Sequence, residues 1–252
     1  MKQNLLISVV VVVLLAVAGF GAYKVMQNSD QKNQEPVQTE STQTQNTDQL
    51  NNEQTSMEDK TKAEPIAGCT RNFDSNVLKT AKVDLSNKFV TLSVKGFGDI
   101  KLELFAKDAP KTVENFLRLA NSGYYDCITF HRVAKGFVIQ GGDPTGTGSG
   151  GESAFGGEFA DELNPATSSY KAGYLKGTLA MANRGPNTNT SQFFIMLGDV
   201  ELPKSYTIFG KVSAGLTVVD KIGAVEIIPQ LGATDGKPVE PVVIEKAVIS
   251  SK

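Results

Sequence analysis

Apolar and polar positions alternate in short runs from residue 83 onward, and this pattern predicts β-strands. In "KFVTLSVK" and "DIKLELF" every second position is apolar, and the intervening "GFG" suits the turn of a hairpin. Further apolar runs follow at "ITFHRV", "GFVIQGG", "GTLAMAN", "SQFFIML", "YTIFGKV" and "VVIEKAVI". Roughly eight strands separated by glycine and proline turns predict a mainly β fold, an antiparallel barrel or sandwich.

Two segments between the strands have helical patterns. We expect Asp108 to cap the first helix, with Pro110 in its first turn and Gly123 at its end. Its apolar positions recur at the i, i+3, i+4, i+7 spacing of one buried helix face: Val113, Phe116, Leu117 and Ala120. The second helix is predicted at "GLTVVDKIGA".

Residues 1–26 have the pattern of a membrane anchor or a signal peptide. An apolar run from Leu5 to Tyr23 lies between Lys2 and Lys24, and at about 1.5 Å per residue it nearly spans a hydrocarbon layer of roughly 30 Å. "AVA" at residues 16–18 also fits the small-x-small site at which signal peptides are cleaved. We favour an uncleaved anchor, with secretion after cleavage as the alternative. Both place the rest of the chain outside the cytoplasm.

Residues 27–65 predict a disordered polar linker. The segment is rich in Gln, Asn, Thr, Ser and Glu, with eight acidic and three basic side chains. It cannot bury enough apolar surface to offset the entropy lost on ordering. The chain therefore divides into a membrane segment (1–26), a linker (27–65), an N-terminal extension (66–82) and one folded domain (83–252).

Composition and charge exclude several classes of function. The 252 residues are 40% hydrophobic with a formal net charge of −2, and residues 66–252 carry 20 basic against 19 acidic side chains. A domain so close to neutrality has no evident basic patch for a nucleic-acid backbone, and we expect no nucleic-acid partner. Two cysteines and one histidine make a poor zinc site, so we expect no metal.

The two cysteines, Cys69 and Cys127, lie in the part of the chain expected outside the cytoplasm, where disulfides persist. Two cysteines allow only one pairing. They can form that disulfide or remain two unrelated thiols, and the sequence leaves both possibilities open.

The stretch "GGDPTGTGSGG" at residues 141–151 contains G-x-G-x-x-G, the pattern of a dinucleotide-binding loop. Such a loop needs a following helix and an acidic residue about 20 positions further on. The segment that follows holds more glycines and a proline, and no Asp or Glu occurs from Leu163 through Gly198. This rules against a nucleotide-dependent oxidoreductase, and we expect a structural loop and no cofactor.

Three long motifs carry a specific resemblance: "FHRVAKGFVIQGGDPTGTG", "MANRGPNTNTSQFFI" and "YTIFGKV". They resemble the cyclophilin family of peptidyl-prolyl cis-trans isomerases from about Val83 to Ile249. The resemblance implies a closed eight-stranded antiparallel barrel capped by two α-helices, which binds proline-containing polypeptides in a surface groove. It also implies isomerase activity without a cofactor, and we expect a monomer.

The resemblance assigns roles to individual positions. The catalytic arginine falls on Arg132, and His131 beside it is interpreted as a structural, hydrogen-bonding residue. The proline pocket falls on Phe137, Val138, Phe194 and Leu202. The rest of the groove falls on Gln140, Gly148, Ala182, Asn183, Gln192 and Tyr206.

Departures from the family pattern point to altered pocket selectivity, and cyclosporin binding is not assumed. The chain has no tryptophan, Tyr206 replaces a frequent histidine, and Val138 replaces a common methionine. Rotation about an X–Pro bond breaks no covalent bond to carbon, so it needs no nucleophile. A preorganised donor such as Arg132 can instead stabilise the twisted state of the amide. We predict an isomerase that assists the folding of exported proteins. The alternative is a non-catalytic chaperone or scaffold module that binds proline-containing segments.

Overall fold

The computed structural model describes residues 66–86 and 89–251. The predicted membrane segment (1–26) and linker (27–65) lie outside these residues. Within the described ranges, no helix is long and apolar enough to cross a membrane.

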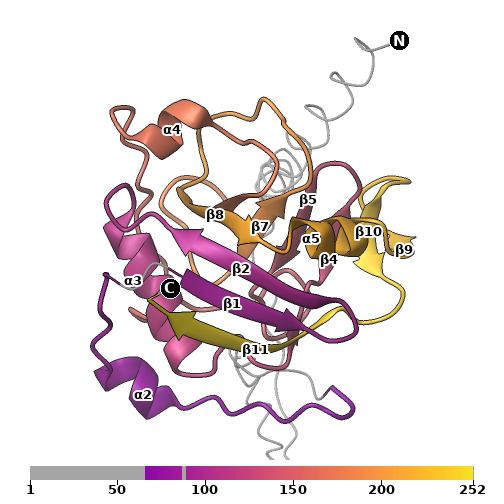
Figure 1. Cartoon of the computed structure of the whole chain (residues 1–252), viewed down its shortest axis with the longest axis horizontal. Helices are drawn as coiled ribbons and strands as arrows, with labels where there is room; N and C mark the ends of the chain where they lie inside the picture. Colours follow the sequence, from indigo (N-terminus) through magenta and orange to yellow (C-terminus); the bar gives the residue numbers. More distant parts are fainter. Residues whose placement is uncertain (1–65, 87–88, 252) are drawn as a thin grey trace, which may run out of the picture. The chain divides into compact units, whose positions relative to one another are not determined.

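The described residues form one antiparallel sheet with the strand order β3-β11-β1-β2-β8-β6-β7-β5-β4-β10-β9 (Figure 1). The predicted first hairpin is present, with Val90 opposite Leu102 and the turn at residues 95–97. The strands are β1 (Phe89–Val94), β2 (Gly98–Leu104), β3 (Ile128–Thr129), β4 (Arg132–Ala134), β5 (Val138–Gly141), β6 (Thr178–Met181), β7 (Phe193–Met196), β8 (Ile208–Ala214), β9 (Ile227–Pro229), β10 (Asp235–Pro238) and β11 (Val243–Ser250).

The mainly β, antiparallel fold is confirmed, with a difference in detail. The prediction was a closed barrel of eight strands, whereas the described sheet has 11 strands and two edges, β3 and β9. It is therefore curled rather than closed by strand pairing. The extra strands are short: "ITFHRV" divides into β3 and β4, and β10 has the sequence DGKP. Asp, Gly and Pro are disfavoured in strands, so β10 had no sequence signal.

Alternating side chains of β4, β5, β6 and β7 point to opposite faces of the sheet, and each face packs into a different apolar cluster. One set lies in the main core: Val133, Ile139, Leu179, Met181, Phe193 and Ile195. Their neighbours form a second cluster: Ala134, Val138, Ala180, Phe194 and Met196. A strand that is apolar on both sides is the expected result of burial on both faces.

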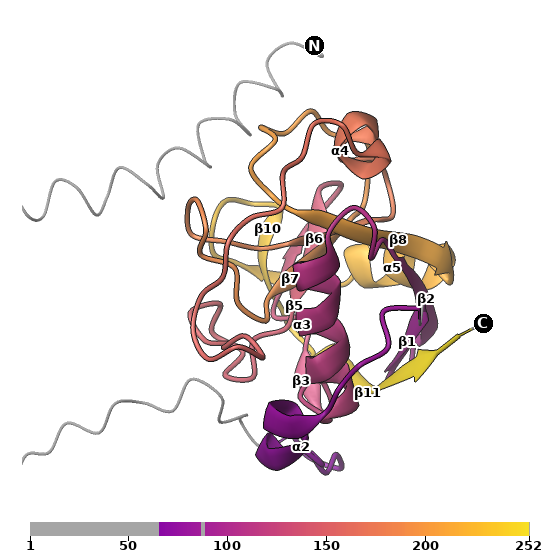
Figure 2. The ribbon, with the colours of Figure 1, turned by 90° about the vertical axis from the view of Figure 1, so that its left-hand side faces the viewer.

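Four helices accompany the sheet in the described part of the chain: α2 (Ser75–Thr80), α3 (Pro110–Asn121), α4 (Ser168–Ala172) and α5 (Leu216–Gly223). The two helices predicted from the sequence are α3 and α5. Figure 2 shows α3 beside the strands, with α2 next to it. The apolar face of α3 is buried as expected, and its Phe116 ring contacts Phe193 at a centroid distance of 5.5 Å.

The predicted N-cap of α3 is wrong. Asp108 accepts a hydrogen bond from Ser169 N (2.9 Å), far away in sequence. The first-turn amides are instead capped by Glu162, whose carboxylate accepts from Lys111 N (3.0 Å) and Thr112 N (2.8 Å). A carboxylate at a helix N-terminus satisfies free amides and complements the helix dipole. Local sequence could not reveal a cap supplied from residue 162.

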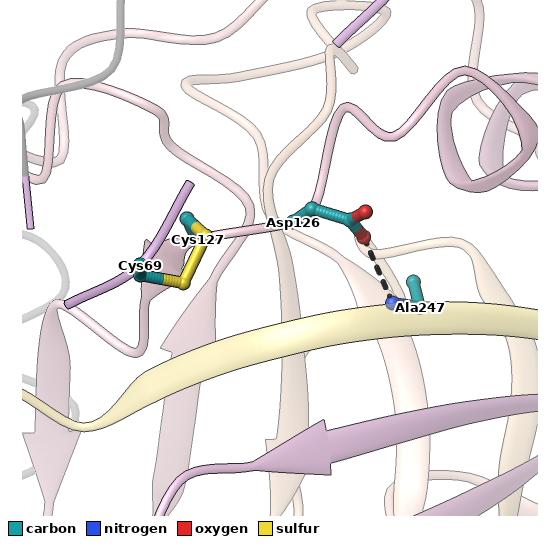
Figure 3. Close-up of a disulfide and its surroundings, with 4 residues drawn as sticks. All are labelled: Cys69, Asp126, Cys127 and Ala247. Carbon is teal, nitrogen blue, oxygen red and sulfur yellow. Dashed lines mark hydrogen bonds between the residues drawn. A yellow bond between two sulfur atoms is a disulfide. The ribbon is translucent and has the colours of Figure 1, made fainter. Parts of the chain in front are cut away.

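The N-terminal extension is attached to the domain by a disulfide between Cys69 and Cys127 (Figure 3). The bond links positions 58 residues apart. Next to it, Asp126 accepts a hydrogen bond from Ala247 N of β11 (3.0 Å). The extension is also held by Arg71, which donates to Tyr124 O (2.8 Å). A covalent link and polar contacts therefore join this segment to the strand-forming part of the chain.

Candidate active site

The strand register places the predicted groove residues in one row across the sheet. Arg132 of β4 lies opposite Gln140 of β5, Gln140 lies opposite Phe194 of β7, and Phe194 lies opposite Ala180 of β6. Since neighbouring strands are about 4.8 Å apart, Arg132 and Phe194 lie about 10 Å apart across the row. A charged side chain and an apolar cluster thus lie on the same face of the sheet, two strands apart.

The predicted apolar pocket residues gather in the second apolar cluster. Val138 and Phe194 are buried members, and Phe137, Ala182, Leu202 and Tyr206 pack against them half-buried. The Phe194 and Tyr206 rings meet edge to face at a centroid distance of 5.6 Å. Tyr206 is held by Tyr174, whose hydroxyl donates to Tyr206 O (3.0 Å) and accepts from Tyr206 N (3.1 Å). The residue that replaces a frequent histidine is therefore a fixed wall of this cluster.

The predicted polar groove residues line a surface cavity of about 70 Å³. Gln140, Gly148, Ala182, Asn183 and Gln192 contribute, and Ala182 belongs to both the cavity and the apolar cluster. The cavity also includes residues that sequence reasoning did not assign: Arg184, Thr188 and Thr190. All three lie in the "MANRGPNTNTSQFFI" motif, so the motif is the sequence signal that could have assigned them to the groove.

Arg132 belongs to a hydrogen-bonded series of side chains. Its Nη1 donates to Gln140 Oε1 (3.0 Å), and Gln140 Nε2 donates to Gln192 Oε1 (2.9 Å). Gln192 Nε2 then donates to the carbonyls of Gly148 (2.9 Å) and Gly150 (2.8 Å). Each amide in the series has a defined orientation, because one end accepts and the other donates. Four of the predicted groove positions are thereby joined to one another.

The other side of the guanidinium is bound by Asp235, which sequence reasoning missed. Arg132 Nε donates to Asp235 Oδ1 (2.8 Å) and Arg132 Nη2 donates to Asp235 Oδ2 (2.6 Å), a bidentate pair. The exposed fractions of the two side chains are 28% and 13%. Asp235 lies in "GATDGKP", a stretch with no strand pattern and no motif, so nothing in the sequence connected it with Arg132.

The glycine-rich loop at 141–151 is organised by Asp143. The Asp143 carboxylate accepts from the amides of Thr145 (2.8 Å), Thr147 (3.1 Å), Gly148 (2.6 Å) and Gly150 (3.2 Å). Burial raises the pKa of Asp143, but the hydrogen bonds from Thr145 and Gly150 outweigh burial, so the pKa lies below its ordinary value. A Cβ on Gly150 would lie 2.3 Å from Asp143 Oδ1, so a larger residue there would displace the carboxylate. The loop turns its amides inward onto a protein carboxylate, which supports a structural loop.

His131 is buried, and its environment corrects part of its predicted role. Neither ring nitrogen has a hydrogen-bond partner among the described residues, so it is not a hydrogen-bonding residue there. Burial lowers the pKa of His131 to about 4, and the nearby Asp143 carboxylate opposes this only in part. The neutral ring packs beneath Gly148, 3.7 Å from the position of a Cβ on that glycine. His131 therefore supports the loop by packing.

Comparison with known proteins agrees with this geometry. Residues 89–249 match the family model described as cyclophilin type peptidyl-prolyl cis-trans isomerase/CLD. This is well over half of the chain. The chain belongs to the cyclophilin-type peptidyl-prolyl cis-trans isomerases. Its enzymatic activity is therefore peptidyl-prolyl cis-trans isomerisation (EC 5.2.1.8).

Individual cyclophilin relatives are similar over nearly their whole length. The chain is 48% identical to peptidyl-prolyl cis-trans isomerase ppi1 of Schizosaccharomyces pombe over 152 residues, 60% of this chain and 92% of that protein. It is 50% identical to the human peptidyl-prolyl cis-trans isomerase-like 1 over 151 residues, 60% of this chain and 86% of that protein. A crystal structure of a Cryptosporidium parvum cyclophilin type isomerase aligns with a TM-score of 0.58 and 40% identity, covering 66% of this chain and 98% of that one.

The buried, neutral His131 predicts a pH dependence of stability. An unfolded histidine has a pKa of 6.5, above the folded value of about 4. As the pH falls, the unfolded state therefore binds the proton before the folded state does. The free energy of unfolding should decrease by about 3 kcal/mol between pH 6.5 and pH 4. His131→Phe keeps a buried ring without nitrogens, so this loss should disappear.

Chemical denaturation at pH 7, 5.5 and 4 measures the effect. His131 is the single histidine of the chain, so no other imidazole titrates in this window. The pKa of Asp143 is lowered from 3.8, so the stability that this carboxylate contributes is lost mainly below pH 4. An equal loss of stability in the wild type and in His131→Phe would contradict the account.

Proposed function

We propose that this isomerase accelerates the folding of exported, proline-containing proteins outside the cytoplasm, tethered by its N-terminal segment. Two observations support the proposal. Residues 1–26 have the pattern of an anchor or signal peptide, and Cys69 and Cys127 form a disulfide, a bond that persists in oxidising compartments. The single observation that carries the catalytic part is the strand register that sets Arg132 and Phe194 on one face of the sheet.

The apolar cluster around Phe194 is the proposed binding site for the proline ring of a substrate. A structure of the Cryptosporidium parvum relative was obtained in the presence of the dipeptide Ala-Pro, which supports binding of such peptides here. Rotation about the X–Pro bond has a barrier of about 20 kcal/mol, because it breaks the conjugation of the amide. An apolar surround disfavours the charge-separated resonance form of the amide and so weakens its double-bond character. Phe137, Val138 and Phe194 supply that surround.

Arg132 is the proposed catalytic residue. In the twisted state the proline nitrogen regains its lone pair and becomes a hydrogen-bond acceptor. Three of the five N–H groups of the guanidinium are used by Asp235 and Gln140, which leaves one on Nη1 and one on Nη2 to donate. Since the acceptor exists only in the twisted state, this bond lowers the barrier without tightening binding of the planar substrate.

Removal of the guanidinium tests this role. Arg132→Ala should lower kcat by about 100-fold, the loss of one preorganised donor, with a smaller change in KM. Exchange NMR on an Ala-Pro peptide measures both constants with the purified full chain. Arg132→Lys keeps a positive charge but cannot donate from a planar fork, so it should restore only part of the rate. Equal rates for the wild type and Arg132→Ala would contradict the assignment.

The alternative function is a proline-binding chaperone or scaffold with little catalysis. The altered groove wall at Tyr206 and the absence of tryptophan favour this reading. The same NMR experiment separates the two functions, because a pure binder shifts the peptide signals without accelerating exchange between the cis and trans forms.

Export and tethering predict a defined location and mass for the chain. In cells that produce the full chain, we expect it in the membrane fraction, with cysteines that alkylate only after reduction. Deletion of residues 1–26 should leave the protein in the cytoplasm with free thiols. Intact mass distinguishes the two N-terminal alternatives, because cleavage after the "AVA" site removes the apolar run. A reduced, full-mass protein in the cytoplasm would contradict the proposal.

A further inference from the structure

The bidentate contact between Asp235 and Arg132 fixes two donors of the guanidinium along one edge. Nε and Nη2 both point to the carboxylate, at 2.8 and 2.6 Å. A single hydrogen bond would leave the planar group free to rotate about that bond, whereas two parallel bonds set its plane. We propose that Asp235 is a positioning residue for isomerisation, holding Arg132 in its working orientation before the substrate arrives. This rests on the role proposed above for Arg132.

The backbone of Asp235 is itself held in place. Its carbonyl accepts hydrogen bonds from Gln230 N (2.9 Å) and Leu231 N (3.1 Å), and its amide donates to Gly232 O (3.3 Å). On the other side, β10 pairs with β4, with Asp235 opposite Ala134. The carboxylate therefore projects from a fixed strand directly beside the strand that carries Arg132. A group that must orient another needs such support from its own surroundings.

Gly236 keeps that strand at the required distance from β9. A Cβ at Gly236 would lie 2.0 Å from Ile228 O and 2.8 Å from the Ile228 carbonyl carbon. These are backbone atoms of β9, so a larger residue would force the two strands apart. The absence of a side chain at 236 thus allows the close pairing that fixes Asp235, its neighbour in sequence.

Gln140 holds the guanidinium from the other side. Its Oε1 accepts from Arg132 Nη1, and its own amide is bound to Gln192, which is anchored on the loop carbonyls of Gly148 and Gly150. Arg132 thus lies between two supports that come from different parts of the chain. The supports use three donors and leave the remaining two with a single orientation.

Asp235 has two opposing effects on the arginine. Its negative charge partly offsets the positive charge of the guanidinium and so weakens the remaining donors. Its two hydrogen bonds also order a long side chain that would otherwise lose its freedom when the substrate twists. We expect ordering to dominate, because the guanidinium stays protonated and the transition-state bond depends on direction.

The test compares Asp235→Ala and Asp235→Asn with the wild type in the full chain. Asp235→Ala should lower kcat about tenfold while KM changes less than about twofold, because the oriented bond forms only in the twisted state. Asp235→Asn keeps one acceptor and should lose less. The Nε–H signal of Arg132 in ¹⁵N-edited NMR should exchange slowly with water in the wild type and lose this protection in Asp235→Ala. This signal reports the contact independently of activity.

The control is Asp220→Asn. Asp220 forms an exposed ion pair with Lys176 (2.7 Å), outside the groove, so kcat and KM should not change. In an Arg132→Ala background, Asp235→Ala should have no further effect on kcat, since it acts through Arg132. Thermal unfolding of each variant identifies a loss due to misfolding.

Three results would overturn the proposal: an unchanged or higher kcat in Asp235→Ala, retained protection of the Arg132 Nε–H signal, or an equal loss with and without Arg132. Failure of this proposal is distinguishable from failure of the proposed function. If Arg132→Ala is impaired and Asp235→Ala is not, only the positioning role is wrong. If Arg132→Ala is as fast as the wild type, the catalytic role of Arg132 is wrong.

Discussion

The antiparallel register of β4, β5, β7 and β6 is the constraint on which the groove depends. Side chains alternate between the two faces of a strand, so Val133, Ile139 and Ile195 enter the main core, whereas Arg132, Gln140 and Phe194 lie on the opposite face. A shift of one residue would exchange these two sets and destroy both the core and the groove. Burial of the inner set therefore also determines where the functional side chains lie.

Hydrogen bonds then fix the orientations of the polar side chains that the strand register brings together. Arg132 is bound between Asp235 and Gln140, and Gln140 is connected through Gln192 to the loop at 141–151. Asp143 orders that loop from within, and the neutral ring of His131 packs beneath Gly148. The groove thus has an apolar wall that is part of a hydrophobic cluster and a polar wall whose members are hydrogen-bonded to one another.

Much of the fold could be predicted from local patterns. The first hairpin, the amphipathic α3, the helix α5 and the strand β11 each have a clear periodicity over several residues, and the three long motifs indicated the groove positions. The features that were missed depend on distant residues. Glu162 caps α3 from 50 positions away in sequence, and Asp235 meets Arg132 across 103 positions. Neither residue stands in a pattern, because an isolated carboxylate on a short strand or loop resembles any solvated acid.

The Cys69–Cys127 disulfide extends this architecture beyond the family match, which begins at residue 89. It fastens the N-terminal extension to Cys127, which lies between α3 and β3 (Figure 3).

The position of the proline ring in a bound peptide tests the central claim most directly. Nuclear Overhauser effects between an Ala-Pro peptide and the full chain would locate it. The account predicts contacts from the ring protons of proline to the side chains of Phe137 and Phe194, on the face of the sheet that carries Arg132. Proline contacts confined to another surface, with none to Phe194, would contradict it.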